Sequence, residues 1–395
     1  MRNKYGFTRI LCYLAYVTEA ACVTVLPMLF ATFSSEYGFT YEQLGRFVLI
    51  SFFIQLFADM ITVKIVKRIG FRGAMMLAEV FACAGFLMFG IAAFTIKNLY
   101  YPLIFCVLVY SFGTGMSEVL VAPTIEYMPT ENKASNMSFL HAAYSIGQVF
   151  IIVGTVVMLS VVKLNWKTVP IIWALLPLIN LIGFSVAPFP DIPIGDEKGD
   201  RSVFRSGGFI LCLILMISGG AVEQVMAQWV SIFSEQGLGV SKTVGDLLGL
   251  GLFGLLMGIG RIAYGFTKIP PQKAMFVLAV ITAAFYGVAV FSHDPFVSLL
   301  ACGGTGVAVS LFWPATSILT AKKFPTGGAS MFALLAFSGD IGCSAAPWLA
   351  GIVSDTVEPH FGSGIALRAG IAVGIFFAAV IICVLPMLKS RAAKN

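Results

Sequence analysis

Charged side chains are scarce in this sequence. Asp, Glu, Lys and Arg make up 11% of its 395 residues, whereas hydrophobic residues make up 58%. Because a soluble domain carries about 25% charged residues, this composition excludes an ordinary soluble domain and favours a protein whose solvent is the lipid bilayer. The net charge of +6 is not taken to indicate nucleic-acid binding, because in a membrane protein the placement of Lys and Arg matters more than their sum.

The eight cysteines include no CxxC pair, and each lies in an apolar run. This favours small packing residues in helices over disulfides or metal ligands. No metal-ligand cluster and no nucleophile–base set stands out. A nucleotide-binding Gly-rich loop follows a strand, whereas the Gly-rich stretch of residues 245–260 does not. We therefore expect no cofactor, no metal and no enzymatic activity. Glu19 and Pro27 interrupt the first apolar run, which is too long for a cleavable signal peptide.

Long apolar runs dominate the chain. A membrane-spanning helix needs about 20 mostly apolar residues, and twelve runs qualify. They cover residues 7–33, 43–66, 72–95, 100–127, 136–162, 168–188, 208–234, 243–266, 273–292, 295–321, 328–353 and 366–388. A proline-rich, charged segment separates the sixth run from the seventh. We predict an all-α membrane protein with a six-helix bundle in residues 1–188, a cytoplasmic linker in 189–207 and a second six-helix bundle in 208–395.

Basic residues predict the orientation. If both termini lie in the cytoplasm, 19 of the 25 Lys and Arg residues fall on the cytoplasmic side, as the positive-inside rule requires. We therefore expect a multi-pass protein of the cell inner or plasma membrane, surrounded by the lipid bilayer and functional as a monomer.

One stretch occurs twice. GTGMSEVLVAP, residues 113–123, recurs 191 positions later as GTGVAVSLFWP, residues 304–314. Pairs at an offset of 200, such as Phe33-Ser34 with Phe233-Ser234, extend the likeness to the earlier helices. Because six spans separate the copies, both halves have the same membrane orientation. Such parallel repeats are related by an axis along the membrane normal, and a binding site is expected between them near the midplane.

This architecture, with basic loops after the second and eighth helices, resembles the major facilitator superfamily over essentially the whole chain. The superfamily motif G-x-x-x-D-R-x-G-R-R is matched at Arg68, Gly70 and Arg72, while Lys67 stands at its acidic position. The stretches FLHAAYSIGQ (139–148) and SGDIGCSAAPWLAGIVSD (338–355) are similar to the fucose- and sugar-permease branch. The resemblance implies a secondary transporter and ranks sugars high among its substrates.

Ionisable side chains at membrane depth are costly and are functional candidates by default. A carboxyl group in a low-dielectric environment can bind and release a proton near neutral pH, which is what a proton-coupled transporter needs. The acids at this depth are Glu19, Asp59, Glu79, Glu118, Glu223 and Asp340, with few cationic partners. We expect Glu19 and Glu223 to bind the substrate or the proton, the alternative being hydrogen bonds to neighbouring helices. Asp340 is a further proton-coupling candidate.

Amide and aromatic side chains near these acids suit a polyhydroxylated or zwitterionic solute, because amides bond hydroxyl groups and rings stack on apolar faces. The expected substrate-binding residues are Tyr16, Glu19, Glu118, Tyr144, Gln148, Glu223, Gln224, Gln228, Trp229, Trp313 and Asp340. His141, Tyr144, Ser145 and Gln148 share one helical stripe. His141 is a candidate proton relay or a capping residue, and the alternative for Trp313 is a lipid-facing position.

Gating is the role we expect for Asp59, Arg68, Arg72 and Arg261. For Asp59, a structural pair with Arg68 or with a neighbouring helix stays open, and Glu79 and Glu126 are interpreted as packing or interface charges.

The sequence thus predicts proton-coupled uptake of a sugar or similar small polar solute by alternating access. The rivals are a proton-driven exporter of lipophilic drugs, which the 35 Phe and 16 Met residues allow, a flippase for lipid-linked solutes, and a non-transporting sensor.

Overall fold

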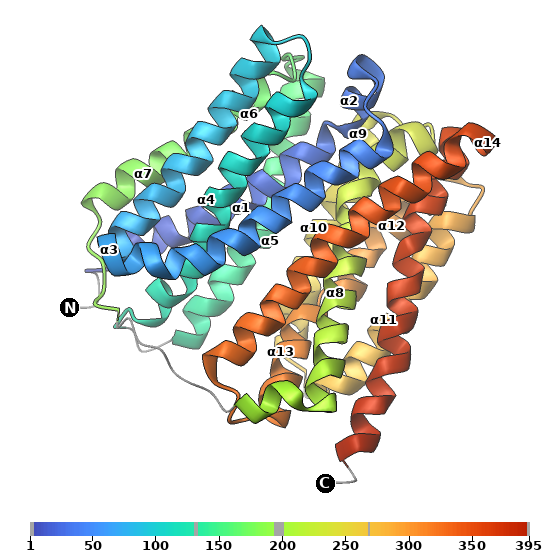
Figure 1. The fold of residues 1–395 in the computed structure, drawn as a ribbon. Helices are drawn as coiled ribbons and strands as arrows, with labels where there is room; N and C mark the ends of the chain where they lie inside the picture. The colour runs from blue at the N-terminus through green and yellow to red at the C-terminus, as the bar shows by residue number, and fades with distance from the viewer. Residues whose placement is uncertain (1–3, 130–132, 193–200, 268, 393–395) are drawn as a thin grey trace. The chain divides into compact units, whose positions relative to one another are not determined.

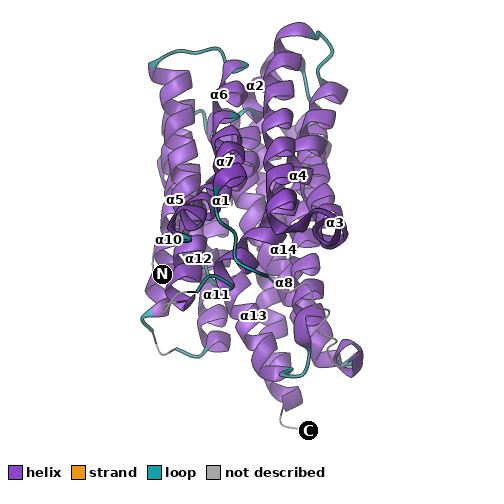
Figure 2. Ribbon diagram, turned by 90° about the vertical axis from the view of Figure 1, so that its left-hand side faces the viewer, coloured by secondary structure: helices purple, strands orange, loops and turns teal. Residues whose placement is uncertain are grey.

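A computed structural model describes residues 4–129, 133–192, 201–267 and 269–392 of the chain (Figure 1). Within these ranges all regular elements are helical, and no strand is present (Figure 2). The predicted all-α class is therefore confirmed.

Ten helical segments in these ranges are long and apolar enough to cross a membrane. Two of them, Tyr41–Thr95 and Ser330–Leu388, have 55 and 59 residues, far more than one crossing needs. Each contains a glycine in the left-handed region, Gly70 with φ 71° and Gly362 with φ 76°, where two helices meet at a kink. Both glycines lie between predicted spans, so counting each long segment as two gives the twelve spans that the sequence predicts.

The chain divides into two compact units. Unit 1 comprises Met1–Tyr37 and Ile50–Ile194, and unit 2 comprises Gly38–Leu49 and Gly195–Asn395. The long helix α3 (Tyr41–Thr95) is therefore shared, because its start belongs to unit 2 and the remainder to unit 1.

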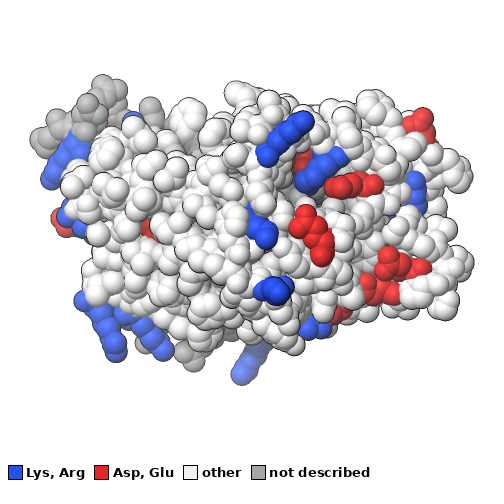
Figure 3. All heavy atoms as spheres, turned by 90° about the horizontal axis from the view of Figure 1, so that it is seen from above, with Lys and Arg blue, Asp and Glu red and all other residues white. Residues whose placement is uncertain are grey.

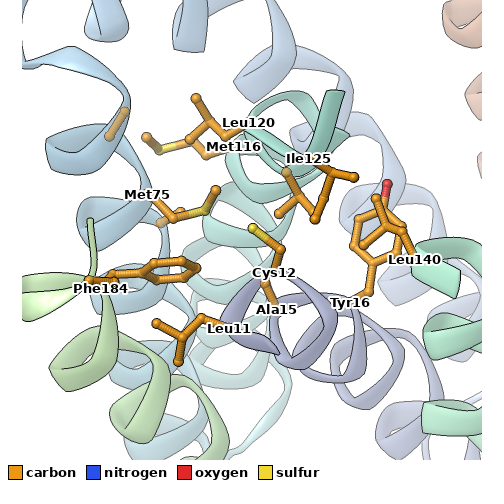
Figure 4. Packing of buried hydrophobic residues seen from close by; sticks show 14 of the residues in the cluster. Leu11, Cys12, Ala15, Tyr16, Met75, Met116, Leu120, Ile125, Leu140 and Phe184 are labelled. Carbon is orange, nitrogen blue, oxygen red and sulfur yellow. The ribbon is translucent and has the colours of Figure 1, made fainter. Parts of the chain in front are cut away.

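Unit 1 is organised around its first helix. Besides most of α3, its elements are α1 (Gly6–Met28), α2 (Phe30–Tyr37), α4 (Tyr100–Glu126), α5 (Lys133–Val156), the π-helical η1 (Val157–Val161), α6 (Thr168–Trp173) and α7 (Leu175–Val186). Helix α1 packs against α4, α5 and α7. Cys12 of α1 and Met75 of α3 point into the middle of the resulting apolar core (Figure 4).

Unit 2 is organised around the packing of α8 on α14. Its elements are η2 (Arg201–Arg205), α8 (Gly207–Ile232), η3 (Phe233–Gly237), α9 (Lys242–Val244), η4 (Gly245–Gly251), α10 (Leu252–Gly265), α11 (Pro271–Phe291), α12 (Pro295–Val309), α13 (Phe312–Lys323) and α14 (Gly328–Ala392). Gly342 of α14 allows the closest approach, because a Cβ there would overlap the carbonyl oxygen of Ile217 in α8. Small residues let membrane helices pack at such short distances.

The outward faces of the helices are apolar. On α3, the side chains of Phe53, Phe57 and Met60 are 50–67% exposed, whereas Gln55 on the opposite face is 5% exposed. This pattern is the reverse of that of a soluble helix and is typical of a helix that faces lipid. Charged side chains occupy only small parts of the face seen in Figure 3. All eight cysteines are free, and only Cys383 is exposed.

Candidate functional site

The polar stripe of α3 in unit 1 faces a matching stripe of α4. The hydroxyl oxygens of Ser51 and Ser111 are 2.8 Å apart and share a hydrogen bond. One turn further along α3, the backbone of Gln55 approaches Gly115 so closely that a Cβ on this glycine would lie 2.7 Å from the Gln55 Cα. The two helices are therefore held in a register that brings their next polar residues together.

Those next residues are Asp59 and Glu118. The two carboxyl groups are close enough to interact electrostatically, and both side chains are partly buried. The phenol of Tyr16, on α1, in turn interacts with the carboxyl groups of Glu19 and Glu118. Unit 1 thus gathers three acids and one phenol from α1, α3 and α4. Asp59 interacts with Glu118 and not with Arg68, so the structural alternative of an Asp59–Arg68 pair is not observed among the described side chains.

Helix α5 contributes two further predicted residues. Gln148 is buried and Tyr144 is half-buried, and α5 lies close to α1, since a Cβ on Gly147 would be 3.0 Å from the Cα of Val17. His141 belongs to α5, but its side chain lies outside the described part of the structure, so its roles as proton relay or cap stay predictions.

In unit 2, Glu223 is paired with an arginine. Glu223 lies near the middle of α8 and is 7% exposed, and its carboxylate is 3.6 Å from the guanidinium of Arg261 on α10. The expectation of few cationic partners is therefore wrong for Glu223. Sequence position placed Arg261 at a helix end and did not show that its long side chain reaches this acid.

Arg261 also contacts a helix break. Its Nε donates a hydrogen bond of 3.2 Å to the carbonyl oxygen of Ser310, which lies between α12 and α13. Pro314 follows four residues later and has no N–H to offer to that carbonyl, which is the usual effect of a helical proline. Arg261 replaces the missing donor. The break falls inside the second copy of the repeated stretch, whereas the first copy lies in the continuous helix α4.

The other predicted residues of α8 are deeply buried. The amide Nε2 of Gln228 donates to Oε1 of Gln224 at 3.0 Å. Trp229 is 1% exposed, and its indole N–H donates to the carbonyl oxygen of Pro347 on α14 at 3.0 Å. These contacts are what packing of α8 on α14 requires, and a role in solute binding stays a prediction for all three residues.

Trp313 lies within unit 2 and is not confined to a lipid-facing position. Its ring fills the space over Gly339 of α14, where a Cβ would lie 2.5 Å from the ring. Asp340, the next residue of α14, is half-buried. The structure thus places Trp313 beside the helix turn that carries Asp340.

The predicted gating arginines of α3 differ from each other. Arg72 donates a hydrogen bond to the carbonyl oxygen of Ala187 at the end of α7, and its guanidinium lies 5.6 Å from the ring centroid of Phe189. Arg68 is exposed. Arg72 therefore stabilises the C-terminal end of α7, as a cation at a helix C-terminus does.

Glu79 occupies a separate buried position in unit 1. It is 2% exposed and accepts a hydrogen bond of 2.9 Å from the amide of Asn180 on α7, which is fully buried. This supports the interpretation of Glu79 as a packing charge between helices.

The pairing of Asp59 with Glu118 is the main feature that sequence reasoning missed. Its signal was present: Ser51, Gln55 and Asp59 repeat every four residues, and Ser111, Gly115 and Glu118 follow one another at helical spacings of four and three residues. No group of three or more His, Cys, Asp or Glu side chains in the described residues is placed to hold a metal ion.

The fold and these side chains together define an integral, multi-pass membrane protein of the transporter class. The family model of the Major Facilitator Superfamily matches residues 12–347. Because this match covers most of the chain, the chain belongs to the major facilitator superfamily, and the resemblance seen in the sequence is confirmed. No curated protein matches the chain by sequence.

Solved structures of other membrane transporters have folds similar to that of this chain. A D-xylose–proton symporter matches with a TM-score of 0.80 at 13% identity, covering 96% of this chain and 97% of that chain. A bacterial homologue of the human lysosomal transporter Spinster matches with a TM-score of 0.78 at 12% identity, covering 99% and 98%. The fucose–proton symporter of E. coli matches with a TM-score of 0.63 at 16% identity, covering 98% and 99%. At these identities the likeness shows the fold alone.

Proposed function

We propose that this transporter couples proton movement to the uptake of a sugar or a similar small polar solute, working as a monomer by alternating access. In this proposal both termini lie in the cytoplasm and the chain resides in the cell inner or plasma membrane. The halves 1–188 and 208–395, joined by residues 189–207, are the parts that move.

The observation that carries the proposal is the close packing of α4 on α3, where a Cβ on Gly115 would lie 2.7 Å from the Cα of Gln55 and 3.0 Å from the Cβ of Ala58. This packing brings the acids Asp59 and Glu118 near each other. Charges at membrane depth are costly, and two neighbouring carboxylates cannot both be ionised without repelling each other. Binding one proton relieves the repulsion. A pair of this kind is suited to carrying a proton through a transport cycle.

Unit 2 supports the proposal with a different arrangement. Glu223 is partly neutralised by Arg261, so a change in the charge of Glu223 changes how strongly Arg261 is held. A solute with hydroxyl groups offers both donors and acceptors to such a pair. The named functions of the xylose and fucose symporters are consistent with this substrate class.

The test is a thermal-shift screen of the purified protein against sugars, amino acids, nucleosides and lipophilic drugs, at two pH values. We expect a sugar or similar polar solute to raise the melting temperature, and the size of the rise to change with pH. Glu118→Gln is expected to remove this pH effect. Glu126→Gln, an exposed acid at the end of the same helix, is the control and should behave as wild type.

Stabilisation by lipophilic dyes and drugs alone would contradict the substrate class and favour the exporter. A polar solute that stabilises wild type and Glu118→Gln equally at both pH values would contradict the role of the acid pair.

A further inference from the structure

The start of α3 receives part of its cap from a residue far away in the chain. The first N–H groups of a helix have no partner inside the helix and need one elsewhere. Thr40 and Gln43 form a capping box, in which the N–H of Gln43 donates to Oγ1 of Thr40 at 3.3 Å and the N–H of Thr40 donates to Oε1 of Gln43 at 3.1 Å. The capping box provides no acceptor for the N–H groups of Tyr41 and Glu42.

The carboxylate of Asp355 on α14 accepts a hydrogen bond from each of these two N–H groups. Its Oδ1 lies 2.7 Å from the N–H nitrogen of Tyr41, and its Oδ2 lies 2.8 Å from that of Glu42. A carboxylate at a helix N-terminus satisfies the donors and interacts favourably with the helix dipole. The capping carboxylate comes from more than 300 positions along the chain, so it constrains tertiary structure as well as the helix end.

The same face of α14 makes further contacts with the start of α3. Trp348 lies two turns before Asp355, and its indole N–H donates to Oε1 of Glu42 at 2.7 Å. Between them, Gly351 has no side chain, and a Cβ there would overlap the carbonyl oxygen of Tyr41. The fit therefore includes the backbone and depends on a residue without a side chain at this position.

The clamped segment carries an exposed charged side chain. The side chain of Arg46, which pairs with Glu42 at 2.6 Å, is 43% exposed. If Asp355 released the helix end, water could reach the freed N–H groups and the carboxylate. Release is then reversible, because water can form hydrogen bonds with the separated polar groups.

The position of the contact between Asp355 and the start of α3 suggests a role in conformational change. All the contacting residues belong to unit 2, to which Gly38–Leu49 is assigned, whereas α3 continues from Ile50 in unit 1. Helix α3 therefore runs through the boundary between the two units. If the halves 1–188 and 208–395 move against each other, as proposed above, the start of α3 has to leave Asp355 of α14.

We propose that Asp355 is a gating residue, which latches the start of α3 onto α14 and must release it once in each transport cycle. This inference rests on the proposed alternating-access function. With cytoplasmic termini, the latch lies at the outer end of the helices, opposite the end that carries the superfamily motif.

The test compares Asp355→Asn with Asp294→Asn in the full-length protein. Asp294 is a matched control, because its Oδ1 accepts from the N–H groups of Phe296 and Val297 at 2.8 and 3.0 Å and so caps α12 locally. Hydrogen–deuterium exchange of the peptides covering residues 38–49 and 295–300 is measured in both variants, together with solute transport in proteoliposomes.

In Asp355→Asn we expect exchange in residues 38–49 to accelerate about tenfold or more, because an asparagine has one acceptor oxygen and no charge. Its transport rate should differ from that of wild type at least about threefold, the size of effect that a lost hydrogen bond gives. Asp294→Asn should accelerate exchange only in residues 295–300 and should transport at the wild-type rate.

The inference is overturned if Asp355→Asn exchanges at the wild-type rate in residues 38–49, or if it transports exactly as Asp294→Asn does. A wild-type protein that moves no solute contradicts the proposed function instead, and with it the role in a cycle, even where the exchange rates confirm the cap. The two failures are therefore distinguishable.

Discussion

Arg261 lies 3.6 Å from the carboxylate of Glu223 and also holds the carbonyl of Ser310. One side chain thus connects α8, α10 and the break between α12 and α13 within unit 2. In unit 1 the corresponding copy of the repeat is an unbroken helix, and it carries Glu118 beside Asp59. The two repeats have the same plan, but unit 1 brings together two acids from α3 and α4, whereas unit 2 pairs an acid of α8 with a base of α10.

The Glu223–Arg261 pair should show coupling in a double-mutant cycle. We expect Glu223→Gln and Arg261→Gln each to lower thermal stability, and the double variant to lose less than the sum, with a coupling free energy of about 1–3 kcal/mol. The reason is that each single change leaves the partner without its counter-charge. Additive effects in thermal unfolding would show that the pair contributes no coupling.

Pro314 should control the helix break. Pro314→Ala restores an N–H to the Ser310 carbonyl, which then competes with Arg261 for this acceptor. We expect equal or higher thermal stability, by up to about 3 kcal/mol, with slower transport. Pro123→Ala, at the matching position of α4, is the control and should leave transport unchanged. Equal effects of the two substitutions on transport would rule out a special role for the break.

Neutralising one acid of the Asp59–Glu118 pair should weaken the coupling of proton to solute movement without lowering thermal stability. Asp59→Asn removes like-charge repulsion from Glu118, so we expect the melting temperature to stay the same or rise. The number of protons moved per solute should fall, and the simultaneous measurement of proton and solute flux in proteoliposomes reports it. A destabilised variant with unchanged stoichiometry would mean that Asp59 is a packing residue.

Asn180 should matter for stability and not for transport. Asn180→Leu removes the donor to Glu79, and leaving a buried acceptor without its bond costs about 1–3 kcal/mol. Replacing both residues, as in Asn180→Leu with Glu79→Met, should recover most of this loss, because two apolar groups need no hydrogen bond. Thermal unfolding checks the stability, and a strong transport defect in the recovered double variant would contradict the packing role of Glu79.

Arg68 and Arg72 lie on either side of the Gly70 kink of α3 and offer a matched pair of substitutions. Arg72→Ala removes the hydrogen bond to Ala187 and the contact with Phe189, so we expect a loss of about 1–2 kcal/mol. Arg68→Ala, at an exposed position, should stay within about 0.5 kcal/mol of wild type. Similar losses for both variants in thermal unfolding would refute the assignment.

The fold could be predicted from the sequence because the bilayer allows few solutions. A run of apolar residues long enough to cross lipid must be helical, so the spans and the superfamily could both be anticipated. The repeat also placed Pro123 and Pro314 at matching positions.

The site could be predicted only in part. Both prolines fit a helix, yet only the second accompanies a break, where Arg261 donates a hydrogen bond to the freed carbonyl oxygen of Ser310. The rotation that turns Asp59 toward Glu118 depends on the close approach at Gly115, which is a matter of packing and not of periodicity. The cap from Asp355 joins positions too far apart in the chain for any local pattern to reveal.

The measurement that tests the central claim most directly is solute-driven proton uptake into proteoliposomes, followed with a pH-sensitive dye trapped inside. For wild type we expect acidification of the lumen when the stabilising solute is added outside, and dependence of its accumulation on the pH gradient. Glu19→Gln, Glu118→Gln and Glu223→Gln should each reduce the proton movement at least about tenfold. Solute accumulation without any proton movement, or full coupling in all three variants, would contradict the account.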